Sequence, residues 1–288
     1  KYAAIVKEPF EIRYHLEKAI DLAKSGRPGP VWLDIPLDVQ ASNIIVEKLK
    51  GYKSDVVKDS NQDFEAHTDN IIGLLTKSEK PLVVVGQGVR NAYAISEFKK
   101  FVDLVNCPII ASRLGLDILP YSHNSFLGLG GIRGRKYSAL IMKQADLLIS
   151  LGSSLSYSFA GEKCSAFSSD AKIIMVDIDE SELDKHSDRI NCSINADIKQ
   201  LLYQLISKLK DEKLPDYSNW LQTCISYKEK YPTVVPDDMK NPINSYYFME
   251  RLEAHSNENH IFVNDAGSAY YIGGQALRFE KGQREITS

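Results

Sequence analysis

Small and polar side chains stand in short turns directly after apolar runs of the chain. Gly86 and Gly88 follow one such run, Gly152 and Ser153 follow a second, and Asp177 ends a third. Glycine lets a backbone approach a phosphate closely, and a carboxylate at such a position accepts a hydrogen bond from a ribose hydroxyl. Residues of these types at successive strand ends are typical of a nucleotide-binding crevice.

The same turns also have purely structural explanations. The G-x-G-x-x-G pattern is incomplete, because Asn91 occupies its third glycine position. A plain strand-to-helix turn therefore explains residues 86–88 as well as a ligand contact does. Asp177 and Asp179 follow a strand, and we expect Asp179 to cap a helix that begins at Glu180 rather than to bind a ribose.

Two arginines lie in a loop that is rich in glycine. Arg133 and Arg135 fall within residues 127–136, where guanidinium groups suit an anion or a diphosphate. Exposed loop arginines that bind nothing specific are common, and the sequence favours this second explanation.

A fourth turn, residues 264–268, joins an apolar run to a helical pattern. Free backbone N–H groups at the start of that helix, together with Gly267 and the Ser268 hydroxyl, would suit phosphate oxygens. In the alternative explanation, Asp265 or Ser268 only caps the helix. The pattern alone leaves both explanations open.

No local pattern assembles a complete active site. The histidines show no metal-ligand spacing, and neither G-x-S-x-G nor C-x-x-C occurs. We therefore expect neither a catalytic residue nor a metal site within the sequence. The widely separated cysteines indicate free thiols rather than disulfides or zinc ligands; they are Cys107, Cys164, Cys192 and Cys224.

Alternating strands and helices must position these turns. Apolar, β-rich runs at residues 81–85, 108–111, 145–150 and 172–176 alternate with amphipathic helical patterns. Such alternation requires parallel pairing with right-handed crossovers. The sequence predicts an α/β fold, a three-layer sandwich with a parallel sheet of about six strands and partial α/β units at both ends. It also predicts one helix over residues 91–105 and a glycine-rich loop over residues 119–134.

Composition and pattern divide the chain into five parts. We expect a partial unit at residues 1–40, a linker at 41–63, a central domain at 64–231, a linker at 232–242, and a truncated unit at 243–288. The chain begins at Lys1 within one pattern and ends at Ser288 within another, so we expect a piece of a longer polypeptide.

Composition excludes several classes of partner. The 288 residues are 43% hydrophobic and 25% charged, as in an ordinary soluble globular protein. A net charge of −3 and a pI near 6.1 disfavour nucleic acid. No apolar run is long enough to span a bilayer, and no signal-peptide pattern opens the chain. We expect a cytoplasmic protein with no membrane partner.

The order of these elements resembles the thiamine-diphosphate-dependent enzymes of the acetolactate synthase, pyruvate oxidase and benzoylformate decarboxylase group. Residues 26–39 resemble the closing strand of that family's pyrimidine-binding domain. Residues 80–88, 119–134, 145–152 and 176–179 resemble its central domain. Residues 262–288 resemble the opening of its diphosphate-binding domain. The large subunit of acetolactate synthase is the member that the chain resembles most.

The resemblance implies a chemistry and a set of site residues. An intact enzyme of this kind binds thiamine diphosphate and Mg²⁺ and acts on a 2-keto acid, by decarboxylation or by ligation to an acceptor. Ala266, Gly267 and Ser268 match the loop that touches the diphosphate. The family's reactive glutamate would lie upstream and its G-D-G metal motif downstream of this sequence. The resemblance thus implies an inactive fragment of a homodimer or homotetramer; substrate and acceptor stay open.

The resemblance also bears on flavin. Acetolactate synthases hold FAD with a Gly-x-Arg-Phe-Asp-Asp-Arg stretch, and residues 152–159 lack both arginines and the paired aspartates. This departure argues against FAD, although the crevice at residues 86–88, 152–153 and 177 suits another nucleotide. The alternative is a stand-alone nucleotide-binding or FAD-binding module without catalysis. A sirtuin-like deacylase is disfavoured, because no paired C-x-x-C zinc site is present.

Overall fold

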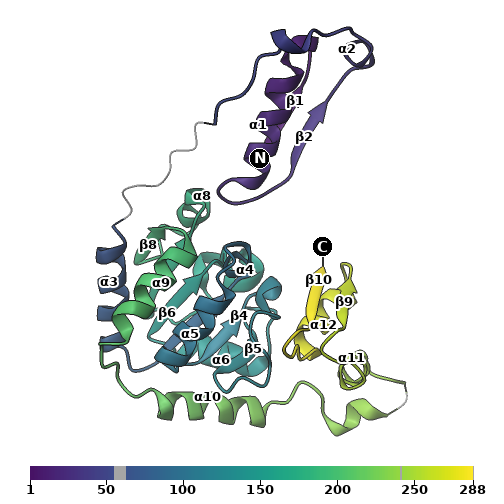
Figure 1. The fold of residues 1–288 in the computed structure, drawn as a ribbon. Coiled ribbons are helices and arrows are strands. Elements are labelled where there is room, and N and C mark those ends of the chain that lie inside the picture. The colour runs from purple at the N-terminus through teal and green to yellow at the C-terminus, as the bar shows by residue number, and fades with distance from the viewer. Residues whose placement is uncertain (55–62, 241, 288) are drawn as a thin grey trace. The chain divides into compact units, whose positions relative to one another are not determined.

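The computed structural model of the chain describes residues 1–54, 63–240 and 242–287. They fall into two compact units, Lys1–Gln62 and Asp63–Ser288 (Figure 1). The predicted linker at residues 41–63 includes residues 55–62, which lie outside the described residues.

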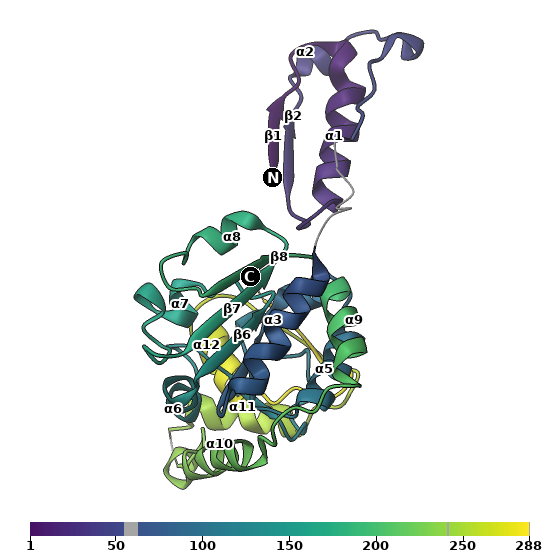
Figure 2. The same ribbon diagram turned by 90° about the vertical axis from the view of Figure 1, so that its left-hand side faces the viewer.

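The first unit is a parallel strand pair with a helix. β1 (Tyr2–Ile5) pairs with β2 (Val31–Asp34), and α1 (Ile12–Lys24) connects them and packs against both (Figure 2). The unit also contains the turns η1 (Pro9–Glu11) and η2 (Val46–Lys48) and the short helix α2 (Leu37–Gln40). The helix and the second strand are confirmed, whereas the strand β1 had not been predicted.

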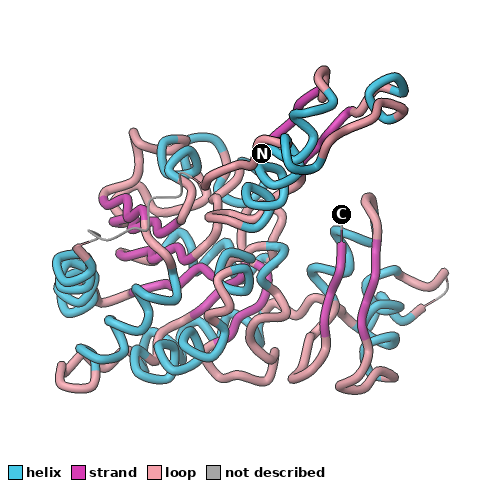
Figure 3. Tube along the Cα trace, turned by 45° about the horizontal axis from the view of Figure 1, so that its top comes forward, coloured by secondary structure: helices cyan, strands magenta, loops and turns pink. Residues whose placement is uncertain are grey.

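The second unit is built on a six-stranded, all-parallel sheet, which confirms the predicted fold class. The strands, magenta in Figure 3, run in the order β5-β4-β3-β6-β7-β8. Their bounds are β3 (Pro81–Val85), β4 (Ile109–Ala111), β5 (Phe126–Leu129), β6 (Leu147–Leu151), β7 (Lys172–Asp177) and β8 (Cys192–Asn195). Strands β3 to β5 are added outward on one side and β6 to β8 outward on the other, so the strand order reverses between β3 and β6 and this pair marks the topological switch point.

Helices cover both faces of this sheet. Every residue of β3 and β6 is therefore buried. Val83 and Val85 face a core formed with α3 (Phe64–Lys77), α5 (Ile95–Val105) and α9 (Ile198–Leu209). Leu82 and Val84 face the other core, formed with α6 (Lys136–Gln144) and α10 (Ser218–Lys230). Alternate residues of one strand thus fill two different cores, which explains the uninterrupted apolar runs.

Two expectations about the central elements are wrong. Residues 91–105 do not form one helix: α4 (Gln87–Asn91) ends before α5, and Tyr93 between them has a φ of 54°. The loop at residues 119–134 contains the strand β5, in which Gly128 has a φ of 78°. Short elements also follow the strands: η3 (Arg113–Gly115), α7 (Tyr157–Ala160), η4 (Glu162–Cys164) and α8 (Glu180–Asp184).

The end of the second unit forms its own parallel pair. α11 (Ser245–Ala254) leads to β9 (Ile261–Asn264), and α12 (Ser268–Ala276) leads to β10 (Arg284–Thr287), which pairs with β9. Before them lies the turn η5 (Pro236–Met239). The helices and the first strand agree with the predicted pattern, whereas β10 had not been predicted.

Candidate functional site

The turn between β9 and α12 has a backbone shape that essentially only glycine adopts. Gly267 is the N-cap residue of α12, with φ 85° and ψ −143°. Among the described residues, no atom other than those of Gly267 and its two chain neighbours lies within 4 Å of the position that a Cβ on Gly267 would take. Asp265, Ala266 and Ser268 are exposed as well. The turn therefore leaves open space in front of the first residues of a helix.

The electrostatics of this turn favour an anion. The first N–H groups of a helix have no partner within the helix, and its dipole places partial positive charge there. The N-cap position belongs to Gly267, which has no side chain to offer. The Asp265 carboxylate accepts a hydrogen bond from the backbone N of Ala266, at 2.7 Å. A group with several acceptor oxygens, such as a diphosphate, is suited to the remaining donors.

Two arginines that follow strands of the central sheet, Arg113 after β4 and Arg133 after β5, contact α12. The guanidinium carbon of Arg113 lies 4.5 Å from the centre of the Tyr270 ring, and its Nε donates to Tyr270 O at 3.1 Å. The guanidinium of Arg133 lies 4.7 Å from the centre of the Tyr271 ring. Arg133, considered as an anion ligand from the sequence, thus stacks on a tyrosine of α12. These stacks fix the helix that the candidate turn begins.

A buried ion pair continues from Arg113 to the strand β10. Arg113 donates to both carboxylate oxygens of Glu285, with 2.5 Å between Nη2 and Oε1. Asn264 Nδ2 donates to the same Oε1 at 2.6 Å. The Glu285 side chain is only 4% exposed. Strand, helix and central sheet are therefore joined through one carboxylate.

A second carboxylate, Asp117, joins α4 to β10. Arg90 Nη2 donates to its Oδ1 and Arg284 Nε to its Oδ2, each at 2.7 Å. The Asp117 side chain is 4% exposed. We call Arg90, Arg113, Asp117, Arg284 and Glu285 the junction network. Sequence reasoning missed all five, because their partners are distant in the chain and no motif marks them.

The predicted crevice at the switch point is occupied by backbone. Gly88 N donates to Gly152 O at 2.9 Å, and a Cβ on Gly86 would lie 2.2 Å from that same oxygen. Ser153 is buried next to this contact. The two turns thus need glycine in order to pack on each other, without any ligand. Nucleotide binding by Gly86, Gly88, Gly152 and Ser153 stays a prediction.

The acidic residues after β7 stabilise the local chain. Asp179 is the N-cap residue of α8 and accepts from Ser181 N at 3.1 Å, which confirms the expected cap. The carboxylate of Asp177 accepts from Asp179 N at 3.0 Å. A ribose contact by Asp177 stays a prediction.

Arg135 is not an exposed loop arginine. Its residue surface is only 5% exposed, and Nη1 donates to the hydroxyls of Tyr121 at 2.7 Å and Tyr137 at 2.9 Å. Its Nε is buried and has no hydrogen-bond partner among the residues that the structure describes. An arginine buried against phenols rather than carboxylates departs from the usual pairing of buried charges.

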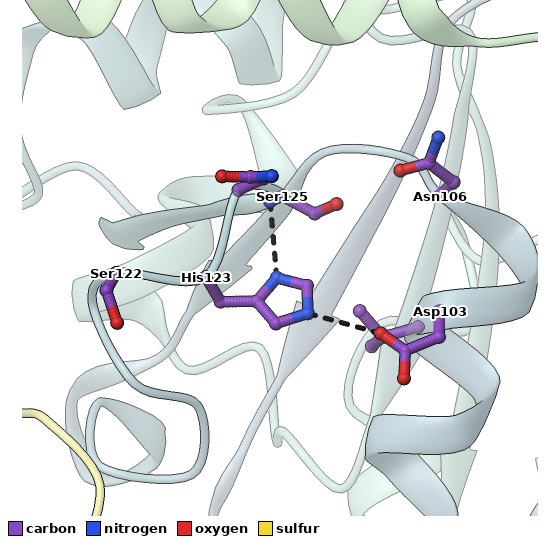
Figure 4. A pocket seen from close by; sticks show the side chains of 7 residues that line it. Asp103, Asn106, Ser122, His123 and Ser125 are labelled. Atoms are coloured by element: carbon purple, nitrogen blue, oxygen red, sulfur yellow. Dashed lines mark hydrogen bonds and ion pairs between the residues drawn. The ribbon is translucent and has the colours of Figure 1, made fainter.

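A separate polar pocket of about 350 Å³ surrounds His123 (Figure 4). His123 Nε2 lies 3.4 Å from Asp103 Oδ1, while Nδ1 accepts from Ser125 N at 3.2 Å. Both ring nitrogens are therefore engaged, and neither is free to activate the nearby Ser122 as a general base would.

Two features are absent from residues 1–54, 63–240 and 242–287. No group of three or more His, Cys, Asp or Glu side chains there is placed to hold a metal ion. No helix of those segments is long and apolar enough to cross a membrane.

Comparison with known proteins gives a consistent result. Residues 68–205 match the family described as "Thiamine pyrophosphate enzyme, central domain". All of the chain aligns with "Acetolactate synthase 2, chloroplastic" of Nicotiana tabacum, at 31% identity over 43% of that protein. All of it also aligns with "Acetolactate synthase isozyme 1 large subunit" of Escherichia coli, at 28% identity over 50% of that protein. "Probable acetolactate synthase large subunit" of Methanocaldococcus jannaschii is 31% identical over 91% of the chain and 45% of its own length. The chain spans about half the length of these relatives.

Proposed function

Because residues 68–205 belong to the family of thiamine pyrophosphate enzyme central domains, we propose that the chain is part of a thiamine-diphosphate-dependent enzyme acting on a 2-keto acid. Support comes from the similarity to acetolactate synthases, which extends over the whole chain. In this proposal, residues 1–40 end a pyrimidine-binding domain and residues 243–288 begin a diphosphate-binding domain.

The turn between β9 and α12 is the observation that carries the proposal. Ala266, Gly267 and Ser268 would hold the cofactor's diphosphate. The open space beside Gly267 and its φ of 85° fit close approach of a bulky anion to the backbone. When bound, thiamine diphosphate supplies a nucleophilic carbon and an electron sink for a 2-keto acid. The backbone N–H groups and the Ser268 hydroxyl would bind and orient it.

The junction network would serve this binding by positioning. Arg113 fixes α12 through Tyr270 and fixes β10 through Glu285. Because α12 begins at the turn and β10 pairs with β9, which leads into it, these attachments would keep the turn in one place without reorganisation on binding.

Several finer features belong to the same proposal. We expect Mg²⁺ beside the diphosphate, a homodimer or homotetramer, and no activity of the 288 residues by themselves. A cytoplasmic location stays a prediction, since the tobacco relatives are chloroplastic by name. FAD is left out, because residues 152–159 lack the arginines and aspartates described above.

The test uses the complete polypeptide that contains this chain. With pyruvate, thiamine diphosphate and Mg²⁺, we expect release of CO₂ and formation of acetolactate. Gly267→Ala should weaken thiamine diphosphate binding about tenfold, because alanine strains this backbone by about 1–3 kcal/mol.

The matched control is Gly26→Ala. Gly26 also has a positive φ, 55°, and the nearest atom to its would-be Cβ is 3.9 Å away. This variant carries backbone strain outside the proposed cofactor turn, so its affinity for thiamine diphosphate should equal that of the unmodified protein. The proposal is contradicted if calorimetry detects no binding of thiamine diphosphate, or if Gly267→Ala and Gly26→Ala bind it equally well.

A further inference from the structure

A cavity of about 580 Å³ lies away from the turn at residues 266–268. It is lined from three parts of the second unit: residues 121–124, the helix α10, and Glu253 of α11 together with Arg278 and Glu280. Pockets of this size are typical of sites for small organic molecules. Its charged lining residues are Lys228, Glu229, Glu253, Arg278 and Glu280.

Three cations lie around the ring of Tyr121, which lines the cavity. Lys228 Nζ lies 3.9 Å from the centre of the Tyr121 ring, and Arg135 and Arg278 lie 5.1 Å and 5.5 Å from it. Lys228 donates to the backbone oxygen of Phe126 at 3.1 Å. In the part of the chain that the structure describes, neither Lys228 nor Arg135 forms an ion pair with a carboxylate.

The pKa values of Tyr121 and Lys228 reflect these three neighbouring cations. Burial by itself would raise the pKa of Tyr121, yet Arg135, Lys228 and Arg278 outweigh it and lower that pKa below its ordinary value. Burial also lowers the pKa of Lys228, and the neighbouring guanidinium of Arg135 adds to the effect. The local field thus favours an added negative charge.

Carboxylates also line the cavity, and Arg278 lies among them. Glu250 Oε2 pairs with Arg278 Nη2 at 3.0 Å, and Glu280 Oε2 accepts from Ser122 Oγ at 2.6 Å. Burial raises the pKa of Glu253, and the carboxylates of Glu280 and Glu250 raise it further against the opposing effect of Arg278. Of these three carboxylates, Glu250 pairs directly with Arg278, whereas Glu253 and Glu280 add negative charge to the cavity lining.

We propose that this cavity binds a small zwitterion with one carboxylate and one ammonium group, the class to which free amino acids belong. The carboxylate would pair with Lys228 and the Tyr121 hydroxyl, and the ammonium with Glu253 and Glu280. A ligand with a single charge would be attracted by the lining residues of one sign and repelled by those of the other. The proposal does not depend on thiamine diphosphate, because no residue of the 266–268 turn lines the cavity.

The test is calorimetric titration of the chain, without thiamine diphosphate, with L-alanine, L-leucine and L-phenylalanine. Propionate and propylamine serve as probes that carry only one of the two charges. We expect at least one of the amino acids to bind the chain. Propionate and propylamine should each bind the chain at least about tenfold more weakly than that amino acid does.

Variants assign the binding to this cavity. Lys228→Met and Glu253→Gln should each weaken binding about tenfold or more, whereas Lys228→Arg should retain most of it. Lys230→Met, two residues further along the same helix and outside the cavity, should bind as the unmodified chain does. Thermal melting identifies any variant that fails to fold. If Lys228→Met does not fold, the test is whether Glu253→Gln loses affinity while Lys228→Arg retains it.

Three outcomes would overturn the proposal: no amino acid binding with a Kd below about 10 mM, equal binding of propionate, or full affinity in Lys228→Met. Equal binding of propionate would mean an anion site instead. A failure here leaves the thiamine proposal unaffected, because that proposal is measured with a different ligand at a different turn.

Discussion

The guanidinium of Arg113 and the carboxylate of Glu285 form a two-point ion pair between residues separated by 172 positions. Their side chains are only 11% and 4% exposed. Water therefore cannot replace either partner cheaply, and loss of one leaves the other charge buried.

Removing Arg113 should destabilise the second unit strongly. We expect Arg113→Met to lower the free energy of unfolding by about 3–5 kcal/mol, because Glu285 then stays buried without its cation. Urea denaturation followed by tryptophan fluorescence measures the loss. The double variant Arg113→Met/Glu285→Gln should recover part of it. The exposed pair Lys240–Asp237 is the control, since Lys240→Ala should cost less than about 1 kcal/mol.

Neighbouring glycines of α12 should respond in opposite directions to alanine. A Cβ on Gly274 would lie 2.6 Å from Arg113 Nε, whereas a Cβ on Gly273 meets nothing closer than 3.6 Å. Gly274→Ala should therefore displace Arg113 and cost about 1–3 kcal/mol. Gly273→Ala should be neutral or stabilise by up to about 1 kcal/mol, since alanine favours a helix. Thermal melting of both variants checks this, and equal melting temperatures would refute it.

The switch-point glycines should be required in the absence of any ligand. Gly86→Ala places a methyl group against the backbone oxygen of Gly152, which cannot move without disturbing β6. We expect a loss of at least about 2 kcal/mol in the free protein. Gly73→Ala in α3, where nothing lies within 4 Å, is the matched control and should not destabilise. If Gly86→Ala keeps full stability, the packing explanation fails and a ligand contact regains weight.

Cys107 should resist thiol reagents far beyond the usual pH range. Burial raises its pKa from 9.0 to about 12, so at pH 8 the thiolate fraction is roughly one in ten thousand. Cys192, which is half-buried, should react first with a chromogenic disulfide.

The same shift has a consequence for stability. Below pH 9 the Cys107 thiol is protonated in both the folded and the unfolded chain. Between pH 9 and about 12, the thiol loses its proton in the unfolded chain but keeps it in the folded chain. The free energy of unfolding should therefore fall as pH rises from 9 toward 12. Rapid labelling of Cys107 in the native protein at pH 8 would contradict both statements.

The central sheet was largely predictable because its signal is local. Runs such as residues 81–85 and 172–176 are apolar throughout, and that pattern requires helices on both faces. The strand β5 was missed because Gly128 interrupts a four-residue run inside a glycine-rich segment. The helix break at Tyr93 was missed because a positive φ at a tyrosine has no sequence signature.

The candidate turn was predictable, whereas its support was not. The turn at residues 264–268 could be predicted because a strand pattern, a glycine and a helical pattern follow one another there in the sequence. Arg113 and Glu285 carry no comparable mark, since each looks like an ordinary surface charge until the fold places them together. Long-range pairs of this kind follow from topology and cannot be read from neighbouring residues.

Among the described residues, the buried guanidinium of Arg135 is bound by the hydroxyls of Tyr121 and Tyr137 and not by a carboxylate. Replacing either phenol with phenylalanine removes an oxygen that a sequestered cation depends on. In related proteins, substitutions at these three positions should therefore occur together rather than singly. Lineages that have lost the arginine should have replaced the tyrosines too.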